Sequence, residues 1–387
     1  MVEWKSIEEI GSYFGGLTGK TKEDFEEGNG KFITYMNVFS NPSLNPSVVG
    51  VVKINEGEKQ NKIQRGDVLF TGSSETPEET GMSCVVTDKL EGDFYMNSFC
   101  FGLRLYKPEQ YNLHYLKHLL RSESVRKSIA KTASGVTRFN ISKARFSKIQ
   151  IPIPSLDEQT RIVGILDTFT ASIENLKEQI AQRRKQYEYY RDQLLDLEGK
   201  EGVYMKALGC ITSFSQGIQV PLSEQSTEKL VGYSRFLRII DYTQGNEDPR
   251  YVPITDKRYW VSKDDIAMVR YGTPGFVCRG FEGILANNLF KITLNEKIKM
   301  DVSYLAYYLK SNKFQSFINQ KSSGGALQAI SFGLIKNIPI PVPPLSEQQR
   351  IVSILDTFEA SIQNLEAQLK QREKQYEYYR NKLLTFE

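Results

Sequence analysis

Three short stretches contain residue types that catalytic or ligand-binding sites use. Residues 15–21 read GGLTGKT and end in the Gly-Lys-Thr that cradles phosphates in nucleotide-binding loops. That loop needs a glycine at position 14, where this chain has Phe14, and no strand-like run precedes it. We therefore interpret residues 15–21 as a basic surface loop.

The two histidines, His114 and His118, stand four residues apart on a predicted helix, a spacing that suits a metal ion. No glutamate follows His114 as the H-E-x-x-H zinc motif requires, and no third ligand is evident. The stretches at Asn41 and Asn45 share only Asn-Pro with the N/D-P-P-Y/F motif of amino-methyltransferases. We predict that the chain has no catalytic residue, no metal site and no cofactor.

Composition predicts a folded, cytoplasmic protein of two or three domains. The chain has 387 residues, of which 40% are hydrophobic and 25% charged. No apolar run approaches the length of a membrane span, and the first ten residues lack the basic and apolar parts of a signal peptide. The four cysteines contain no C-x-x-C pair, so we expect free thiols: Cys84, Cys100, Cys210 and Cys278.

An internal repeat organises the chain. KQYEYYR occurs at residues 185–191 and again at 374–380, an offset of 189 residues. At this offset, residues 156–198 align with 345–387 without a gap, and 29 of the 43 positions are identical. Such self-similarity indicates one structural unit used twice.

Each repeat is predicted to form one long helix. Apolar residues recur at alternating spacings of three and four, the period of a left-handed coiled coil. The predicted seam residues are Leu166, Phe169, Ile173, Leu176, Ile180, Arg183, Tyr187 and Tyr190 in the first repeat, and Leu355, Phe358, Ile362, Leu365, Leu369, Arg372, Tyr376 and Tyr379 in the second.

Polar residues refine this prediction. Arg183 and Arg372 interrupt the seam at the same heptad position, where a polar residue more often fixes register than performs chemistry. Tyr189 and Tyr378 fall outside the seam, which makes them candidates for a partner surface. The chain has an internal pseudo-two-fold axis if the two helices pair antiparallel.

The helix starts have recognisable signals. Asp157 and Ser346 occupy equivalent predicted N-cap positions after a proline-rich extended stretch. Gln349, three residues past Ser346, completes a predicted capping box in the second copy.

The segments between the repeats suggest two similar α+β domains. Both contain short β-rich runs, and each ends in a predicted helix, at residues 112–131 and 302–321. The predicted order is a domain at 1–152, a helix at 153–199, a domain at 200–341 and a helix at 342–387. Outside the two 43-residue repeats the chain has a net charge of +8, which suits a polyanion-binding surface.

The proline-rich helix entries IPIPSLDEQTRIVGILD and IPVPPLSEQQRIVSILD, followed by the repeated helices, resemble the DNA-specificity (S) subunit of type I restriction-modification systems. The resemblance covers essentially the whole chain. It implies that each domain reads one half of a bipartite, asymmetric site in double-stranded DNA. It also implies that the helices pair as an antiparallel coiled coil, set the spacing and bind methyltransferase (M) subunits, two per chain. It further implies that an endonuclease/translocase (R) subunit joins for cleavage.

By the same resemblance, six loops face DNA. Their lysines and arginines suit phosphates or guanine edges, and their glutamines suit adenine. The first domain departs from the compact G-[ST]-x-G loop by a longer GSSETPEETG with three glutamates. The predicted DNA-binding residues are Lys20, Thr21, Lys22, Ser73, Ser74, Thr76 and Arg138 in the first domain, and Gln216, Gln219, Arg270, Tyr271, Thr273 and Gln328 in the second.

Two other classes of function stay open on the sequence. A structural adaptor would use the coiled coil to hold two protein-binding domains. An autonomous nucleic-acid enzyme would carry a motif that is not recognisable here. Sequence-dependent DNA binding separates a specificity subunit from the adaptor, and activity of the purified chain tests the enzyme.

Overall fold

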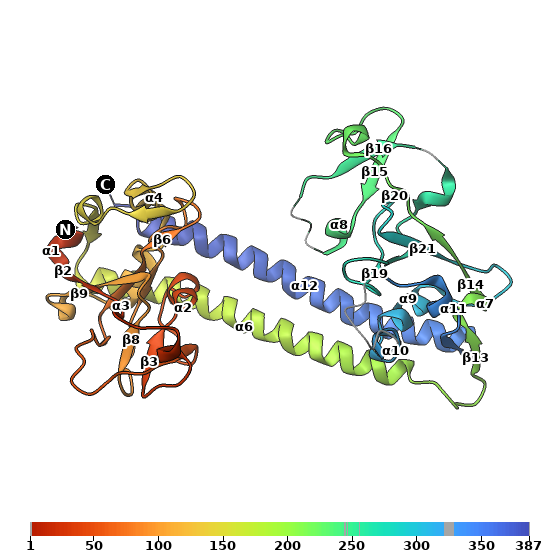
Figure 1. Ribbon diagram of the computed structural model, residues 1–387, viewed down its shortest axis with the longest axis horizontal. Coiled ribbons are helices and arrows are strands. Elements are labelled where there is room, and N and C mark those ends of the chain that lie inside the picture. Colours follow the sequence, from red (N-terminus) through yellow and green to blue (C-terminus); the bar gives the residue numbers. More distant parts are fainter. Residues whose placement is uncertain (1, 244, 246, 255, 321–328, 387) are drawn as a thin grey trace. The chain divides into compact units, whose positions relative to one another are not determined.

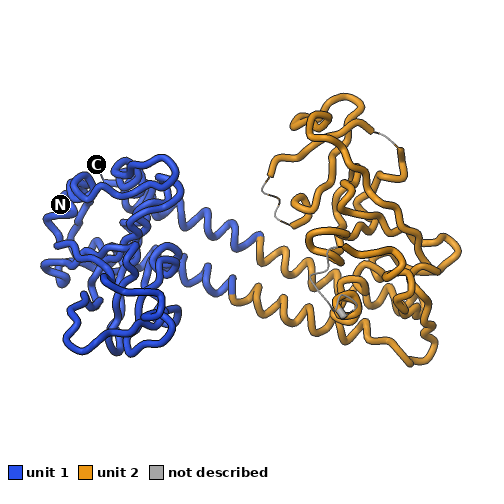
Figure 2. The backbone as a smooth tube through the Cα atoms, viewed as in Figure 1, with its two compact units in different colours: residues 1–177, 367–387 blue, residues 178–366 orange. Residues whose placement is uncertain are grey.

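The computed structural model describes residues 2–243, 245, 247–254, 256–320 and 329–386. The chain divides into two compact units, each built from a domain and segments of both long helices (Figure 2). Unit 1 comprises residues 1–177 and 367–387, and unit 2 comprises residues 178–366. Within the described residues, no helix combines the length and the apolar character that a membrane crossing requires.

Unit 1 contains twelve strands and five short helices among its described residues (Figure 1). The strands are β1 (Glu3–Ser6), β2 (Gly11–Gly15), β3 (Gly30–Ile33), β4 (Val49–Val52), β5 (Val68–Thr71), β6 (Ser73–Ser74), β7 (Ser83–Val85), β8 (Phe94–Met96), β9 (Cys100–Leu105), β10 (Ala133–Ser134), β11 (Phe139–Ile141) and β12 (Gln150–Ile153). The short helices are α1 (Ile7–Ile10), α2 (Tyr35–Ser40), α3 (Leu113–Leu119), α4 (Glu123–Ala130) and α5 (Lys143–Phe146).

Unit 2 has a closely similar set of elements. Its strands are β13 (Tyr204–Ala207), β14 (Thr212–Gln216), β15 (Tyr233–Leu237), β16 (Arg250–Pro253), β17 (Trp260–Val261), β18 (Ile266–Val269), β19 (Val277–Cys278), β20 (Gly283–Leu285), β21 (Leu289–Leu294) and β22 (Pro339–Val342). Its short helices are α7 (Leu208–Ile211), α8 (Ile239–Thr243), α9 (Val302–Lys310), α10 (Asn312–Gln320) and α11 (Phe332–Lys336). The long helices α6 (Leu156–Leu195) and α12 (Leu345–Leu383) contribute to both units.

The main sheets of the two units have the same topology. The order β2-β9-β5-β7 in unit 1 corresponds to β14-β21-β18-β19 in unit 2, with all neighbours antiparallel. A second sheet in each unit contains one parallel pair, β3 with β8 and β15 with β20. The observed architecture is therefore two α+β domains of one fold, as predicted.

One prediction about this architecture is wrong. The single helices expected at residues 112–131 and 302–321 are two helices each, α3 with α4 and α9 with α10. The chain turns at Ser122 and at Ser311, because the carbonyl oxygen of each serine accepts a hydrogen bond that starts the next helix. Short polar residues favour such helix starts.

The core of unit 1 forms between its main sheet, its short helices and the ends of the long helices. Phe70 on β5 and Phe101 on β9 lie against Phe146 on α5, with ring centroids 5.0 and 5.5 Å apart. Leu166 of α6 and Leu384, just past α12, are buried in the same cluster. Each domain therefore packs on both long helices, and Figure 1 shows the C-terminus in unit 1 with the N-terminus.

Buried glutamines fasten the long helices to the domains. The Gln159 side chain on α6 is fully buried; its Oε1 accepts a hydrogen bond from the backbone N–H of Asn112 at 2.8 Å, and its Nε2 donates to the Pro154 carbonyl. Gln348 on α12 is its equivalent and accepts from the N–H of Asp301 at 2.7 Å. Asn112 and Asp301 in turn cap α3 and α9, so one glutamine links each pair of helix starts.

The predicted N-cap of the first long helix is wrong by two positions. The helix α6 already begins at Leu156, and the Ser155 carbonyl accepts the first hydrogen bond, from the N–H of Gln159 at 2.9 Å. Asp157 lies inside the first turn, where a carboxylate is favourable because it faces the positive end of the helix dipole.

The predicted cap of the second long helix is wrong for the same reason. The Pro344 carbonyl accepts from the N–H of Gln348 at 3.1 Å, so α12 begins at Leu345 and Ser346 lies within the helix. The predicted capping box with Gln349 is also wrong. Burial of the neighbouring Gln348 side chain fixes this helix start, and Gln349 is exposed.

Candidate nucleic-acid interface

In unit 1 the structure brings together two loops that were predicted to face DNA. Strand β6 lies in the GSSETPEETG loop and pairs antiparallel with β11, which lies within the stretch SGVTRFNIS (residues 134–142). Ser73 lies opposite Asn140. The Arg138 Nε donates a hydrogen bond to the Ser73 Oγ at 2.9 Å. The exposed guanidinium of Arg138 lies 5.7 Å from the centre of the Phe99 ring.

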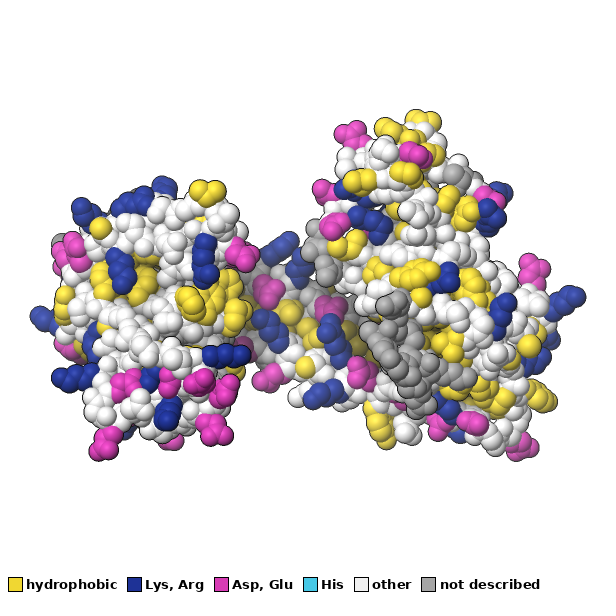
Figure 3. All heavy atoms as spheres, in the orientation of Figure 1, with side chains coloured by type: hydrophobic (Ala, Val, Ile, Leu, Met, Phe, Trp, Pro, Cys, Tyr) yellow, Lys and Arg dark blue, Asp and Glu magenta, His cyan; other side chains and the backbone are white. Residues whose placement is uncertain are grey.

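These two loops and helix α2 line an open hollow of about 440 Å³. Tyr35 and Met36 of α2 form one wall, and Glu75, Glu79 and Arg138 lie on the other sides. Figure 3 shows hydrophobic side chains gathered over α2, with basic and acidic side chains beside them. The hollow therefore combines an apolar wall with charges of both signs.

Two half-buried arginines hold the longer loop and the strand that follows it in place. Arg126 of α4 donates hydrogen bonds of 2.6 to 2.7 Å to the carbonyls of Glu78, Thr80 and Gly81. Arg121 donates to the Ser83 carbonyl at 2.6 Å. Burial lowers the pKa of both guanidinium groups to about 10, so both stay charged at neutral pH. The loop is thus fixed through its backbone, while its Glu75 and Glu79 side chains are exposed.

The first predicted DNA-facing loop of unit 1 is placed differently. The Lys20 ammonium forms an ion pair with Glu58 at 2.6 Å, and its side chain is only 5% exposed. Thr21 donates its hydroxyl to Asp24 at 3.1 Å. Lys22 is exposed, and none of these residues lines the hollow. Lys20 is therefore not the exposed side chain that a DNA contact needs, because Glu58 and the Lys53 carbonyl bind its ammonium group.

In unit 2 the structure gathers three of the predicted residues. The Arg270 guanidinium lies 5.1 Å from the ring centres of both Tyr271 and Phe332. Its Nη1 donates to the Gln216 Oε1 at 2.6 Å, and its Nε donates to the Ile330 carbonyl at 3.1 Å. Tyr271 is 40% exposed, so an aromatic face next to a cation is open to solvent.

Gln216 differs from its predicted role. Its Nε2 donates to the backbone carbonyls of Asn287 and Leu289, and its Oε1 accepts from Arg270, so both ends of the amide are already bonded. A bidentate contact from Gln216 to adenine would require breaking these bonds.

The remaining predicted residues of unit 2 are more exposed or are not described. Gln219 is exposed and its Oε1 accepts from the Asn287 side chain at 3.3 Å, and Thr273 is exposed in the turn after Tyr271. Gln328 lies outside the described residues.

The helices pair antiparallel within each unit. In unit 1, Phe169 of α6 stacks on Tyr379 of α12 with ring centres 5.2 Å apart. Lys177, further along α6, pairs with Glu373, which comes before Tyr379 on α12. The Arg372 guanidinium lies 5.6 Å from the Phe169 ring. The predicted polar seam residue therefore rests on an aromatic seam residue of the other helix.

Unit 2 repeats this arrangement with the helices exchanged. Phe358 of α12 stacks on Tyr190 of α6 at 5.5 Å, and the Arg183 guanidinium lies 5.9 Å from the Phe358 ring. Arg184 pairs with Glu366 at 2.5 Å. The duplicated KQYEYYR stretch thus builds the same aromatic contact in each unit.

The predicted seam residues differ in burial. Those that are buried are Leu166, Ile173, Ile180 and Leu355; those that are half-buried are Phe169, Leu176, Arg183, Tyr187, Phe358, Ile362, Leu365, Leu369, Arg372 and Tyr376. Tyr190 and Tyr379 are 47% and 39% exposed, so they form the edge of the seam rather than its interior. Each stacks edge-to-face on the more exposed tyrosine before it, Tyr189 or Tyr378.

The histidines have a structural role that the sequence did not indicate. His118 of α3 is buried; its Nε2 lies 2.7 Å from Asp167 of α6 and its Nδ1 lies 2.9 Å from the Tyr376 hydroxyl of α12. Lys117 also pairs with Asp167, at 2.8 Å. Burial lowers the pKa of His118 and outweighs the opposing hydrogen bond with Asp167. One neutral histidine therefore joins the domain of unit 1 to both helices.

Unit 2 makes the corresponding contact with different chemistry. Tyr307 occupies the position 189 residues after His118, and its hydroxyl donates to Asp356 at 2.5 Å. Lys310 and the Tyr187 hydroxyl meet at Glu359, at 3.4 and 3.0 Å.

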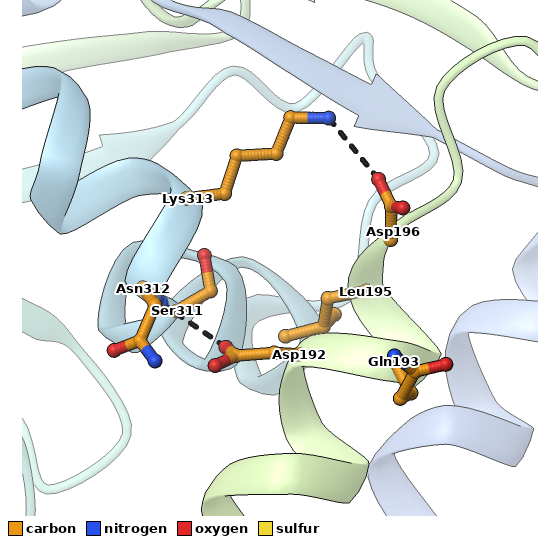
Figure 4. Close-up of a pocket in the computed structure, with 7 residues that line it drawn as sticks. All are labelled: Asp192, Gln193, Leu195, Asp196, Ser311, Asn312 and Lys313. Carbon is orange, nitrogen blue, oxygen red and sulfur yellow. Dashed lines mark hydrogen bonds and ion pairs between the residues drawn. The ribbon is translucent and has the colours of Figure 1, made fainter.

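A second anchor lies where α6 ends against the start of α10 (Figure 4). The Asp192 Oδ1 accepts from the N–H of Asn312 at 3.0 Å, and Lys313 reaches Asp196 at 3.1 Å. In unit 1, Asn381 of α12 accepts from the N–H of Glu123 at 3.1 Å in the same way. In each unit, a side chain of a long helix thus caps the first turn of a short helix of the domain.

Within the described residues, no group of three or more His, Cys, Asp or Glu side chains is arranged to hold a metal ion. The four cysteines are free thiols, as predicted, and Cys210 is exposed.

The family follows from a match that covers most of the chain. A family model for the type I restriction modification DNA specificity domain matches residues 1–183 and 242–373. The chain belongs to this family. The match extends over the first domain, most of the second and much of both long helices of this specificity subunit.

Known specificity subunits support the assignment. The EcoR124I/EcoR124II specificity subunit of Escherichia coli is 33% identical over 266 residues, which are 63% of this chain and 65% of that one. A provisionally named type I restriction enzyme specificity subunit of Haemophilus influenzae is 30% identical over 295 residues, covering 72% of this chain and 73% of its own.

Solved structures support the fold. A chain from a structural study of assembly and conformational transition of the type I restriction-modification system aligns with a TM-score of 0.63 at 17% identity, covering 99% of this chain and 97% of its own. The M. genitalium S subunit aligns with a TM-score of 0.54 at 18% identity, covering 100% and 97%. Both likenesses concern the fold alone.

Sequence reasoning missed several residues of the unit 1 hollow. Tyr35, Met36 and Glu79 come from segments far apart in the sequence, and no local pattern marks them. The only available signal was the unusual number of glutamates in the loop that carries Glu79.

Proposed function

We propose that the chain is the sequence-recognition subunit of a type I restriction-modification complex. Each domain reads one half of a bipartite, asymmetric DNA site in the cytoplasm, and the helices set the spacing between the halves. The chain itself supplies no catalysis; methyltransferase subunits bound to it modify the DNA, and an endonuclease/translocase subunit cleaves it.

This proposal rests on one observation: the two units share one scaffold but present different polar surfaces. Tyr115 and Tyr304 donate their hydroxyls to equivalent carbonyls, at 2.9 and 3.0 Å, and Gln159 and Gln348 make equivalent anchors. The loops carried on this common frame differ in length, charge and contacts. Such a pattern suits two domains that bind the same kind of ligand but read different sequences of it.

Mapping of methylated sites tests the proposal. The chain would be expressed with a methyltransferase partner in a host that lacks adenine methylation, and modified bases would be mapped by sequencing. We expect one split site with unlike halves. Complete absence of sequence-dependent modification or binding, with both proteins folded and associated, would favour the adaptor instead.

The exposed tyrosines support a docking surface for the methyltransferase subunits. Tyr189 and Tyr378 are 62% and 59% exposed, and each stands in the same aromatic set of its unit. A surface kept unchanged in both units, while the DNA-facing loops differ, suits two copies of one partner. Tyrosine is enriched at the centres of protein interfaces because it buries a large rigid ring.

Native mass spectrometry tests this docking surface. Tyr189→Ala or Tyr378→Ala should each weaken binding of one methyltransferase copy, and the double variant should lose both. Glu188→Ala, in the same heptapeptide, is the matched control. Unchanged stoichiometry and affinity in the double variant would place the docking surface elsewhere.

The spacing role has its own test. One heptad added to both helices at matched positions lengthens each by about 10 Å, equivalent to about three base pairs of duplex. We expect a longer unread spacer and weaker binding, since three base pairs also rotate one half-site. An unchanged spacer at full activity would show that the helices do not set it.

A further inference from the structure

The hollow of unit 1 contains opposite charges that do not neutralise each other. Glu79 and Arg138 line the same space, yet among the described residues no ion pair within 4.0 Å joins them. Each of the two side chains is nevertheless held in place through one of its atoms. Arg138 is bonded to Ser73 through its Nε, and the Glu79 Oε2 accepts from Ser74 and Thr76 at 3.3 and 3.1 Å.

Each group keeps its outward face for a ligand. In the described residues, the only protein hydrogen bond of the Arg138 guanidinium is through Nε, which leaves the two Nη groups as a planar pair of donors. The Oε1 of Glu79 likewise has no hydrogen bond from a described residue. A fixed fork of donors therefore stands beside a fixed acceptor.

This arrangement is unfavourable for a phosphate. A phosphate attracted by Arg138 would approach Glu75 and Glu79, whose carboxylates repel it. A ligand that offers both acceptors and a donor within one flat edge suits the hollow better. In the major groove, guanine offers the acceptors N7 and O6, and the cytosine paired with it offers the N4 amino group.

We propose that unit 1 reads one G·C base pair through this hollow, with Arg138 on the guanine and Glu79 on the cytosine. This inference rests on the proposed DNA-recognition function and names the base pair that one site takes. Arginine pairs bidentately with guanine O6 and N7, and glutamate accepts from cytosine N4.

The surroundings support a pre-arranged reading site. The Arg126 hydrogen bonds fix the backbone on both sides of Glu79, at Glu78 and Thr80. The hairpin that carries Arg138 turns tightly at Gly135, where a Cβ would lie 2.0 Å from the Arg138 carbonyl oxygen. Val136, at the tip of this hairpin, is 91% exposed, which suits contact with a groove rather than with the protein's own core. Little ordering is therefore left for the moment of binding.

The test uses the full chain assembled with its methyltransferase partner and a mapped split site. Binding is measured on duplexes in which each base pair of both half-sites is replaced in turn. We expect one G·C pair in one half-site at which Arg138→Ala and Glu79→Gln each reduce discrimination, by about five- to a hundredfold for Arg138. Discrimination in the other half-site should be unchanged, which also shows that the variants are folded.

A base analogue and a conservative variant separate base reading from other roles. At that base pair, 7-deazaguanine should weaken binding by the wild-type complex and leave Arg138→Ala unaffected, because the N7 contact is already absent. Arg138→Lys should lose the discrimination, since lysine keeps the charge but not the fork. Glu78→Gln, whose side chain is exposed and does not line the hollow, is the matched control.

The possible failures are distinguishable. If Arg138→Ala weakens binding equally at every sequence and Arg138→Lys restores it, Arg138 contacts phosphate and the inference is overturned, while the recognition function stands. If the variants alter discrimination at an A·T pair only, the assignment of G·C is overturned. If the wild-type complex shows no split site at all, the proposed function itself fails.

Discussion

The two units of this specificity subunit share their anchors and differ in their loops. Arg126 of unit 1 donates to three carbonyls of a long acidic loop. Gln315, 189 residues later, donates to one carbonyl of a much shorter loop, that of Gly275, and to the Leu309 carbonyl at the end of its neighbouring helix. A longer loop needs more hydrogen bonds to be fixed, since each ordered residue costs conformational entropy. At this position the scaffold differs where the longer loop requires more support.

The contacts with the long helices vary less, but they are not identical. His118 of unit 1 and Tyr307 of unit 2 occupy equivalent positions and both reach an aspartate of α6 or α12. Burial lowers the pKa of His118, whereas burial raises the pKa of Tyr307. We therefore expect the two domains to respond differently to acid.

The largest expected effect comes from making the two units alike. Replacement of residues 200–340 with a second copy of 1–150 should convert the asymmetric split site into a palindromic one, because both halves would then carry the same loops. Mapping of methylated sites measures this. Retention of the original asymmetric site would show that the domains do not read the halves independently.

Loss of the buried glutamine should lower the stability of either unit by a similar amount. Gln159→Leu leaves a buried N–H and a buried carbonyl without partners, so we expect unit 1 to lose about 2–4 kcal/mol of stability. Gln348→Leu should cost unit 2 a similar amount. Each unit has one tryptophan, Trp4 or Trp260, so single-tryptophan variants report denaturant unfolding of each unit separately.

The chain offers a matched control for this comparison. Gln349→Leu changes the exposed neighbour of Gln348, and its effect should stay within about 0.5 kcal/mol. A large loss for Gln349→Leu, or a small one for Gln348→Leu, would contradict the buried anchor and restore the capping box predicted from sequence.

The smallest expected effect is a difference in acid sensitivity. Burial lowers the pKa of His118 below that of an unfolded histidine, about 6.5. As pH falls below about 6.5, the unfolded chain therefore takes up a proton that the folded chain resists, and unit 1 loses stability. Burial alone would raise the pKa of Asp167, but hydrogen bonds from His118 and Lys117 outweigh it and lower this pKa. Protonation of Asp167 therefore affects the stability of unit 1 only at a much lower pH.

Unit 2 provides the design for the acid control. His118→Tyr copies the residue found at Tyr307 and should remove the acid loss from unit 1. Unfolding followed through Trp4 at pH 7.5 and 5.5, with Trp260 as the internal reference, measures it. Equal acid sensitivity of the wild type and His118→Tyr would show that another group is responsible.

The sequence by itself determined the features that depend on repeated local patterns. The 3,4 spacing predicted the long helices, and the offset of 189 predicted two similar domains. These predictions are confirmed because a coiled-coil period acts through residues close together along one helix. The heptapeptide likewise predicted Tyr189 and Tyr378 outside the seam, and both are exposed.

Only the tertiary structure decided which polar side chains are available at the candidate interface. Lys20 and Gln216 suit DNA contacts by residue type, yet Glu58 binds one and Arg270 and two carbonyls bind the other. The hollow around Arg138 draws on segments that lie up to about a hundred residues apart, as Tyr35 and Arg138 do. Hydrogen-bond partners that distant leave no local periodicity, because the folded chain alone brings them within bonding distance.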